Sequence, residues 1–479
     1  MNLSKVKQEK KSINLIKNII LFFVANFMPK AITFFMVPLY TYCLSTEEYG
    51  KVDILITTIQ FLLPILTIQV QDAMLRFSLE KKNNPSDVLT IGLRIVLIGS
   101  LLLFVACNLG IVTGFIKIDL IYIIIFFIMY LLHAFKNIAS YFCRGIDKIG
   151  ILTTSNVILT LSTVLCNLVF LLVFKWGVLG YILSLCIGHL LGVLILFFGA
   201  KLYKYIKPTL SDKTLTKKII LFSIPMIFSA VSWWVNSSLD KYILGYFCGA
   251  SAVGLLAVAY KIPSILSLFG ITIANAYSIS AIKDFDKNDT DGFLGNSYSV
   301  INICFVLMCS VLMIANVFLS KMLFSNDFFT AWEYVPPLLI SALMSQLSLM
   351  CEQYYVAMKK TKIISATAII GAIINTVLNV LFIPAYGTYG AAIATALSIF
   401  VVWLVRYIVL NRYIKLKHNF FVECISYILL IIQLAFAYSG NRFVLNQIII
   451  MIVIITLYVR QIKKIIFTAF RFLTAKTKG

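Results

Sequence analysis

The chain has 479 residues, of which 61% are hydrophobic and only 13% are charged, and its formal net charge is +22. This composition excludes a soluble globular protein. The basic residues lie between apolar runs and do not form one basic face, so a nucleic-acid-binding module is excluded as well. Because the runs are continuously apolar and do not alternate with polar residues, we predict an all-α integral membrane protein and not an outer-membrane barrel.

Fourteen membrane-spanning helices are predicted, each long enough to cross a hydrocarbon core about 30 Å thick. In chain order they cover residues 18–43, 52–72, 89–112, 119–140, 151–174, 177–199, 219–247, 252–281, 296–320, 334–358, 363–383, 388–410, 419–438 and 443–460.

The distribution of Lys and Arg predicts that both termini are cytoplasmic. With the N-terminus inside, most of the 41 basic residues fall in or beside inner segments, as the positive-inside rule requires. The basic residues left for the outer loops are Lys51, Lys117, Lys175, Lys321 and Arg442.

The crossings are predicted to form two sets of six, followed by two more. The basic loop 201–218 separates an N-lobe, residues 1–200, from a C-lobe, residues 219–412, and residues 413–479 hold crossings thirteen and fourteen and a basic tail. A repeat supports this division: Asn167 precedes Gly177-Val-Leu-Gly180, and Asn379 precedes Gly387-Thr-Tyr-Gly390. Transporters commonly contain such internal duplications, although small residues also serve helix packing alone.

The sequence contains no recognised nucleotide-binding or catalytic motif. It has no phosphate-binding loop that ends in Gly-Lys-Ser/Thr, no His-Glu-x-x-His and no nucleophile elbow. The ten cysteines are scattered singly and the three histidines form no sequence cluster. We therefore expect neither an enzyme nor a metal or cofactor site.

Ionisable residues inside apolar runs are the candidates for function, because each costs about 2.5–3.5 kcal/mol at the centre of a membrane helix. Lys30 lies about 18 Å along crossing one and follows Pro29. Lys261 lies in crossing eight and is followed closely by Pro263. We expect these two lysines to present cations to a hydrated central space; the alternative is pairing within the helix bundle.

Asp240 and Lys241 are adjacent in crossing seven, so their side chains point about 100° apart and need separate partners. Asp240 is expected to meet a cation such as Lys261, whereas Lys241 either contributes to the cationic space or extends to the membrane surface.

Asp240 and three further ionisable residues are candidates for gating or ion coupling. Asp72 and Arg76 have the i, i+4 spacing of a helical ion pair. Glu352, in crossing ten, is a candidate proton-titrating carboxylate or a structural partner. Arg94, Arg144 and Arg406 are expected to extend their side chains to the membrane surface.

Several segments resemble the Wzx-type O-antigen flippases. They are the stretch Val37-Pro-Leu-Tyr followed by Leu44-Ser-Thr-Glu-Glu-Tyr-Gly50, the stretch Asp240-Lys241-Tyr-Ile-Leu with Val253-Gly254 and Ala257-Val-Ala-Tyr-Lys261, and the segment 375–394. The resemblance implies the fold of the multidrug/oligosaccharidyl-lipid/polysaccharide exporter superfamily, in which two six-helix lobes form a V and two helices are added.

The resemblance also implies an activity, the transfer of an undecaprenyl-diphosphate-linked oligosaccharide from the inner to the outer leaflet of a bacterial inner membrane. Lys30, Lys261 and Lys241 would bind the diphosphate, and a proton or cation counter-ion and the polysaccharide polymerase machinery would be partners. A drug or cation antiporter and a flippase for the lipid-linked peptidoglycan precursor are the alternatives.

Overall fold

The computed structural model describes residues 31–80, 82–114, 119–207, 213–283, 286, 288–290, 292–438 and 443–476; the side chains of 275–276, 278–283, 293, 443, 460, 462 and 464–476 are not described. In these ranges the chain is helical and contains no strand. It divides into two compact units, Met1–Ser238 and Leu239–Gly479, and the long helix α9 continues from one into the other.

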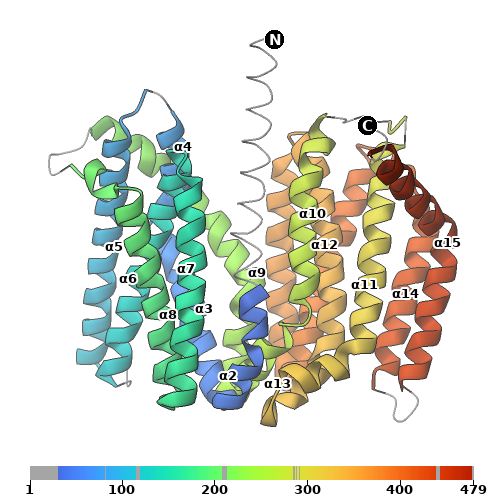
Figure 1. Ribbon diagram of the computed structural model, residues 1–479, viewed down its shortest axis with the longest axis horizontal. Coiled ribbons are helices and arrows are strands. Elements are labelled where there is room, and N and C mark those ends of the chain that lie inside the picture. Colours follow the sequence, from blue (N-terminus) through green and yellow to red (C-terminus); the bar gives the residue numbers. More distant parts are fainter. Residues whose placement is uncertain are drawn as a thin grey trace. The chain divides into compact units, whose positions relative to one another are not determined.

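Unit 1 contains α2 to α8 and the first part of α9. The helices are α2 (Val37–Cys43), α3 (Thr46–Leu66), α4 (Val70–Leu79), α5 (Pro85–Val112), α6 (Leu120–Gly145), α7 (Ile149–Asn167), α8 (Gly177–Leu194) and α9 (Lys213–Ala259). Two π-helical segments, η1 (Leu168–Val173) and η2 (Ile195–Gly199), extend α7 and α8, and the short 3₁₀ helix η3 (Leu202–Tyr205) follows. Helices α5 to α8 run alongside one another (Figure 1).

Crossing two is longer than predicted and is interrupted. Pro64 lies in the last turn of α3, and Ile68 and Gln69 adopt left-handed backbone conformations before α4 begins. Two consecutive residues with left-handed backbone angles cannot continue a helix, so the chain turns there and continues as a second helix to Leu79.

Unit 2 contains the rest of α9 and helices α10 (Ser264–Lys283), α11 (Phe293–Leu323), α12 (Val335–Ala357), α13 (Thr361–Asn411), α14 (Phe420–Phe436) and α15 (Phe443–Lys476), with the 3₁₀ helix η4 (Asn326–Tyr334) before α12. Gly249 divides α9, and Gly387 divides α13, because both glycines have non-helical backbone angles. The predicted boundaries between crossings seven and eight and between eleven and twelve fall at these two kinks.

The duplicated Gly-x-x-Gly turns share two backbone features. Gly177 and Gly387 have positive φ angles of 54° and 56°. A Cβ on Gly180 would lie 3.3 Å from the carbonyl oxygen of Phe170, and one on Gly390 would lie 2.4 Å from that of Phe382. The first glycine therefore allows the turn and the second allows the new helix to pack against the end of the previous one.

Within the described ranges, nine helices are long and apolar enough to cross a membrane, and four shorter apolar helices accompany them. Many large apolar side chains on their outer faces are exposed, among them Leu101, Phe228 and Ile373. Such surfaces are stable in contact with lipid and not with water.

Candidate functional site

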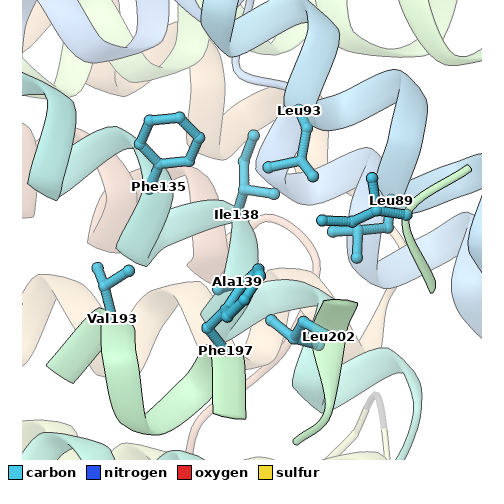
Figure 2. A pocket seen from close by; sticks show the side chains of 9 residues that line it. Leu89, Leu93, Phe135, Ile138, Ala139, Val193, Phe197 and Leu202 are labelled. Atoms are coloured by element: carbon cyan, nitrogen blue, oxygen red, sulfur yellow. The ribbon is translucent and has the colours of Figure 1, made fainter. Parts of the chain in front are cut away.

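A small apolar pocket in unit 1 is enclosed by α5, α6, α8 and the segment that follows (Figure 2). Its volume is about 130 Å³, and its lining includes Leu89, Phe135, Ile138 and Phe197. Cavities of this size and composition remain dry, so this pocket offers no place for a charged headgroup.

Lys261 lies at an interruption of crossing eight. Helix α9 ends at Ala259 and α10 begins at Ser264, with Pro263 in the intervening turn. This crossing begins after the kink at Gly249, with Ala250. Lys261 is eleven residues further, hence about 17 Å along the crossing, which is close to half the thickness of the membrane core. The N–H groups of Tyr260 and Lys261 donate to the carbonyl oxygens of Leu256 and Val258, so the chain passes this interruption in a hydrogen-bonded turn.

Asp240 is buried beside the same interruption. Its carboxylate accepts a hydrogen bond of 3.0 Å from the Tyr260 hydroxyl and one of 2.9 Å from the backbone N–H of Lys241. Tyr260 directly precedes Lys261. The hydrogen bond to Tyr260 thus brings Asp240 next to the turn that contains Lys261, and Lys241 is the chain neighbour of Asp240. Lys30 lies outside the described residues.

Glu352 forms an ion pair with Arg406, which connects α12 to α13. The Arg406 side chain is only 6% exposed, and it also donates to the hydroxyls of Ser348 and Thr367 at 2.8 Å each. Arg406 therefore does not extend to the membrane surface, contrary to the prediction. Several hydrogen-bond acceptors surround the guanidinium group, and its five N–H donors can form hydrogen bonds with all of them.

Asp72 and Arg76 are paired differently from the prediction. Arg76 lies 3.9 Å from Glu80 and 4.8 Å from the ring centroid of Phe222 on α9, and Asp72 accepts a hydrogen bond from the Gln69 amide. The interruption before α4 puts Gln69 next to Asp72, and Arg76 extends toward the end of α4, where Glu80 lies.

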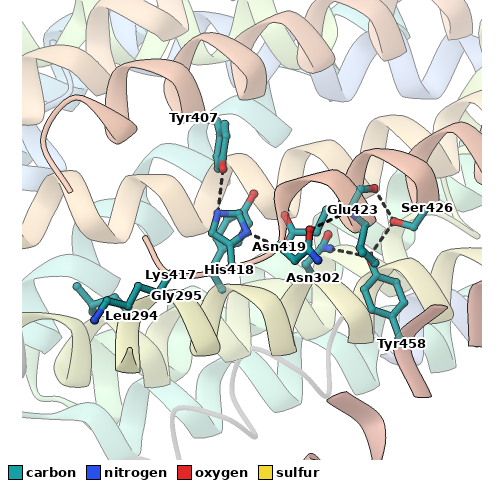
Figure 3. A network of polar contacts seen from close by, with 12 residues as sticks. Leu294, Gly295, Asn302, Tyr407, Lys417, His418, Asn419, Glu423, Ser426 and Tyr458 are labelled. Atoms are coloured by element: carbon teal, nitrogen blue, oxygen red, sulfur yellow. Dashed lines mark hydrogen bonds and ion pairs between the residues drawn. The ribbon is translucent and has the colours of Figure 1, made fainter. Parts of the chain in front are cut away.

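A polar network that sequence reasoning missed joins α11, α13, α14 and α15 (Figure 3). The two ring nitrogens of His418 lie 2.9 Å from a carboxylate oxygen of Glu423 and 2.8 Å from the Tyr407 hydroxyl. The side chains of His418 and Glu423 are 2% and 1% exposed. The other carboxylate oxygen of Glu423 is buried and has no hydrogen-bond partner.

The same network continues into α15. The Tyr427 hydroxyl donates to Asn302, the Asn302 amide donates to Tyr458, and the Tyr458 hydroxyl donates to Ser426. These bonds satisfy polar groups that would be costly to bury unpaired, and they attach α14 and α15 to α11.

Two histidines of unit 1 also come together. The rings of His133 on α6 and His189 on α8 are stacked with centroids 3.8 Å apart. Each Nδ1 lies within 2.9 Å of the carbonyl oxygen four residues earlier, so each Nδ1 carries the proton. These two residues are 56 positions apart in the sequence, and only the packing of α6 on α8 joins them.

A second groove in unit 1 lies between α5 and α9. It has a volume of about 540 Å³ and is lined by both apolar and basic side chains. The basic ones are Arg94, Lys213 and Lys217.

Comparison with known protein families gives a match between residues 15–278, more than half of the chain, and the family described as polysaccharide biosynthesis protein. The chain belongs to this family. A curated relative is the probable low-salt glycan biosynthesis flippase Agl15 of Haloferax volcanii, which is 23% identical over 40% of this chain and 42% of its own length. The chain thus spans less than half the length of this relative.

Solved structures establish the fold of this polysaccharide biosynthesis family member. The lipid II flippase MurJ, in its inward closed conformation, has a TM-score of 0.69 at 16% identity and covers 92% of this chain and 100% of its own. An inward-facing multidrug resistance MATE transporter of the MOP superfamily has a TM-score of 0.64 at 11% identity over 81% of this chain and 97% of its own.

The predicted all-α fold of the multidrug/oligosaccharidyl-lipid/polysaccharide exporter (MOP) superfamily is confirmed, and the protein is a multi-pass membrane protein. The matched proteins are flippases and transporters and not enzymes, in agreement with the sequence analysis.

Proposed function

We propose that this protein is a flippase that moves an undecaprenyl-diphosphate-linked oligosaccharide, such as an O-antigen repeat unit, across the bacterial cytoplasmic membrane. The family match supports a role in polysaccharide biosynthesis, and the MOP fold supports transport. The substrate's diphosphate is strongly hydrated, so its passage through lipid needs a protein surface that replaces water.

The position of Lys261 is the observation that carries the proposal. Lys261 is at mid-depth in an interrupted crossing, and the hydrogen bond between Asp240 and Tyr260 brings together the chain neighbours of these residues, Lys241 and Lys261. In this proposal the two amines supply positive charge where the diphosphate crosses. Transporters of other folds bind charged substrates at such helix interruptions. Lys261, Lys241 and Lys30 bind the diphosphate in this proposal, and the lipid tail stays in the bilayer.

Alternating access with both termini cytoplasmic is part of the proposal, with residues 1–200 and 219–412 as the two moving lobes. Asp240 and Glu352 are the proposed coupling carboxylates for a proton or cation. Protonation of Glu352 would remove the charge that pairs with Arg406 and so loosen α12 from α13. Asp72 and Arg76 have a proposed gating role, and the polymerase machinery is a proposed partner on the outer side.

Transport by the purified protein provides the test. The protein is reconstituted into liposomes with undecaprenyl-diphosphate oligosaccharide, and an added glycosidase digests only the sugar that faces outward. We expect the digestible fraction to rise with time in the presence of protein. A matched assay with the lipid-linked peptidoglycan precursor shows which of the two lipid-linked substrates the protein transfers.

Deletion of the gene gives an independent readout in cells. Complete lipid-linked units should accumulate at the cytoplasmic face and surface glycan should fall. Drug sensitivity with normal surface glycan, and no glycan transfer in liposomes, would instead favour a drug antiporter and reject the proposal.

A further inference from the structure

The groove between α5 and α9 has a basic end and an apolar end. Arg94, Lys213 and Lys217 supply three positive charges, and the lining residues include no carboxylate. The nearest acid along α5 in sequence, Asp87, already pairs with Lys207 at 3.1 Å. The side chains that line the groove therefore bring positive charge to it and no negative charge.

The apolar end continues along both helices. From Arg94, one face of α5 presents Ile98, Leu101 and Val105, with 61%, 62% and 46% of their surfaces exposed. From Lys217, the matching face of α9 presents Leu221, Ile224 and Phe228, with 60%, 41% and 73% exposed. The spacing of three, four and seven residues keeps each set on one side of its helix.

Both apolar faces have the length of an acyl chain in one leaflet. Arg94 to Val105 and Lys217 to Phe228 each span eleven residues, which is about 16 Å of helix. Half of a hydrocarbon core about 30 Å thick is about 15 Å. A ligand that fits this arrangement has an anionic head beside the three cations and apolar chains that extend from it along the exposed faces of α5 and α9.

We propose that this groove binds one anionic phospholipid, with its phosphate on Arg94, Lys213 and Lys217 and one acyl chain along each helix. Arginine and lysine contribute charge-assisted hydrogen bonds to phosphate oxygens. Two apolar faces match a diacyl lipid better than a single polyprenyl chain. The lipid belongs to the leaflet at which α5 and α9 begin, and its binding does not depend on glycan transport.

Native mass spectrometry of the full chain tests the proposal. The protein in detergent receives an equal mixture of phosphatidylglycerol and phosphatidylcholine with identical acyl chains. We expect preferential retention of one phosphatidylglycerol. In the variant with Lys213→Gln and Lys217→Gln, the affinity for phosphatidylglycerol should fall about tenfold, since two charge-assisted contacts are lost.

A matched variant controls for total charge. Lys204→Gln with Lys218→Gln removes the same two charges, and Lys218 is adjacent to Lys217 but does not line the groove. This variant should bind phosphatidylglycerol within about twofold of the parent. Because all four lysines are exposed, both variants should melt at the parent temperature.

Three results would overturn the proposal: no preference for phosphatidylglycerol in the parent, equal losses in the two double variants, or displacement of the lipid by chain-free glycerophosphoglycerol at equal concentration. Stronger binding of undecaprenyl phosphate than of phosphatidylglycerol would also overturn it, because the groove would then hold a single-chain carrier.

Discussion

Lys261 is the residue on which the proposed substrate binding depends most directly. Lys261→Ala should reduce glycan transfer in liposomes by roughly tenfold to a hundredfold, the range for losing one or two hydrogen bonds to a charged group. Lys261→Arg should retain most of the transfer, because it keeps the positive charge. The initial rate of glycosidase-accessible product measures both.

Expression and folding of the two Lys261 variants need to match for this comparison to hold, which size-exclusion profiles can establish. Normal transfer by a well-folded Lys261→Ala variant would contradict the role assigned to this amine. A matched change at exposed Lys218 should leave the rate unchanged, because that lysine lies at the start of α9, far along the chain from the interruption.

The Arg406 network makes a separate prediction about stability. Arg406→Met removes the charge partner of Glu352 and two hydroxyl contacts, so it should lower the free energy of unfolding by about 3 kcal/mol. This is the lower end of the range for a broken buried pair, because Glu352 remains 27% exposed. Thermal unfolding in detergent provides the measurement.

Exposed Arg412, near the end of the same helix, offers the control. Arg412→Met should change the melting temperature little. Similar melting of the two variants would show that the Arg406 network does not stabilise the packing of α13 on α12. The sequence could not distinguish these arginines, because both lie near the predicted end of crossing twelve and only the packed helices reveal the acceptors around Arg406.

At the scale of elements, the second glycine of the repeated turn should tolerate no side chain. Gly390→Ala places a Cβ 2.4 Å from the Phe382 carbonyl oxygen, so one helix must move away from the other. We expect a loss of about 1–3 kcal/mol, the usual cost of overpacking. Comparison of melting temperatures in detergent tests this expectation.

Gly150 provides a matched alanine substitution in a helix. A Cβ at this position meets nothing within 4 Å, so Gly150→Ala should be neutral or slightly stabilising. An equal effect of both substitutions would mean that the close approach at Gly390 is unimportant for stability.

Helices were predictable from the sequence where the apolar runs were long. The interruptions of these helices were predictable only in part. Pro263 and the glycines at 249 and 387 mark real breaks. The left-handed residues Ile68 and Gln69 carry no such signal, because isoleucine and glutamine rarely adopt this backbone conformation. Crossing two was therefore predicted to end near residue 72, although α4 continues to Leu79.

For the whole molecule, the positive-inside rule predicts the side on which each loop lies. In a cysteine-free variant of the chain, Asp327→Cys should react with a membrane-impermeant maleimide in intact spheroplasts, and Lys82→Cys should not. Both should react after permeabilisation. The opposite pattern would place the termini outside. Reaction of both cysteines in intact spheroplasts would contradict the predicted topology, because the two loops would then lie on the same side.

The candidate site was predictable only in part. Buried charges are costly, so Asp240 and Lys261 stood out within apolar runs, and the structure joins Asp240 to Tyr260, the chain neighbour of Lys261. The residues of the His418 network gave no comparable signal. His418 directly precedes predicted crossing thirteen and Glu423 lies in its first turns, where ionisable residues commonly face the membrane surface, and only the packed helices show that both are buried.

The stacked imidazoles of His133 and His189 limit the positive charge that this part of unit 1 can hold. Each ring has one nitrogen left to accept a proton, yet two positive rings 3.8 Å apart would repel by about 4 kcal/mol at an effective dielectric constant of 20. Two charged rings would therefore push α6 and α8 apart. The packing of α6 on α8 thus requires that at least one of the two rings is neutral.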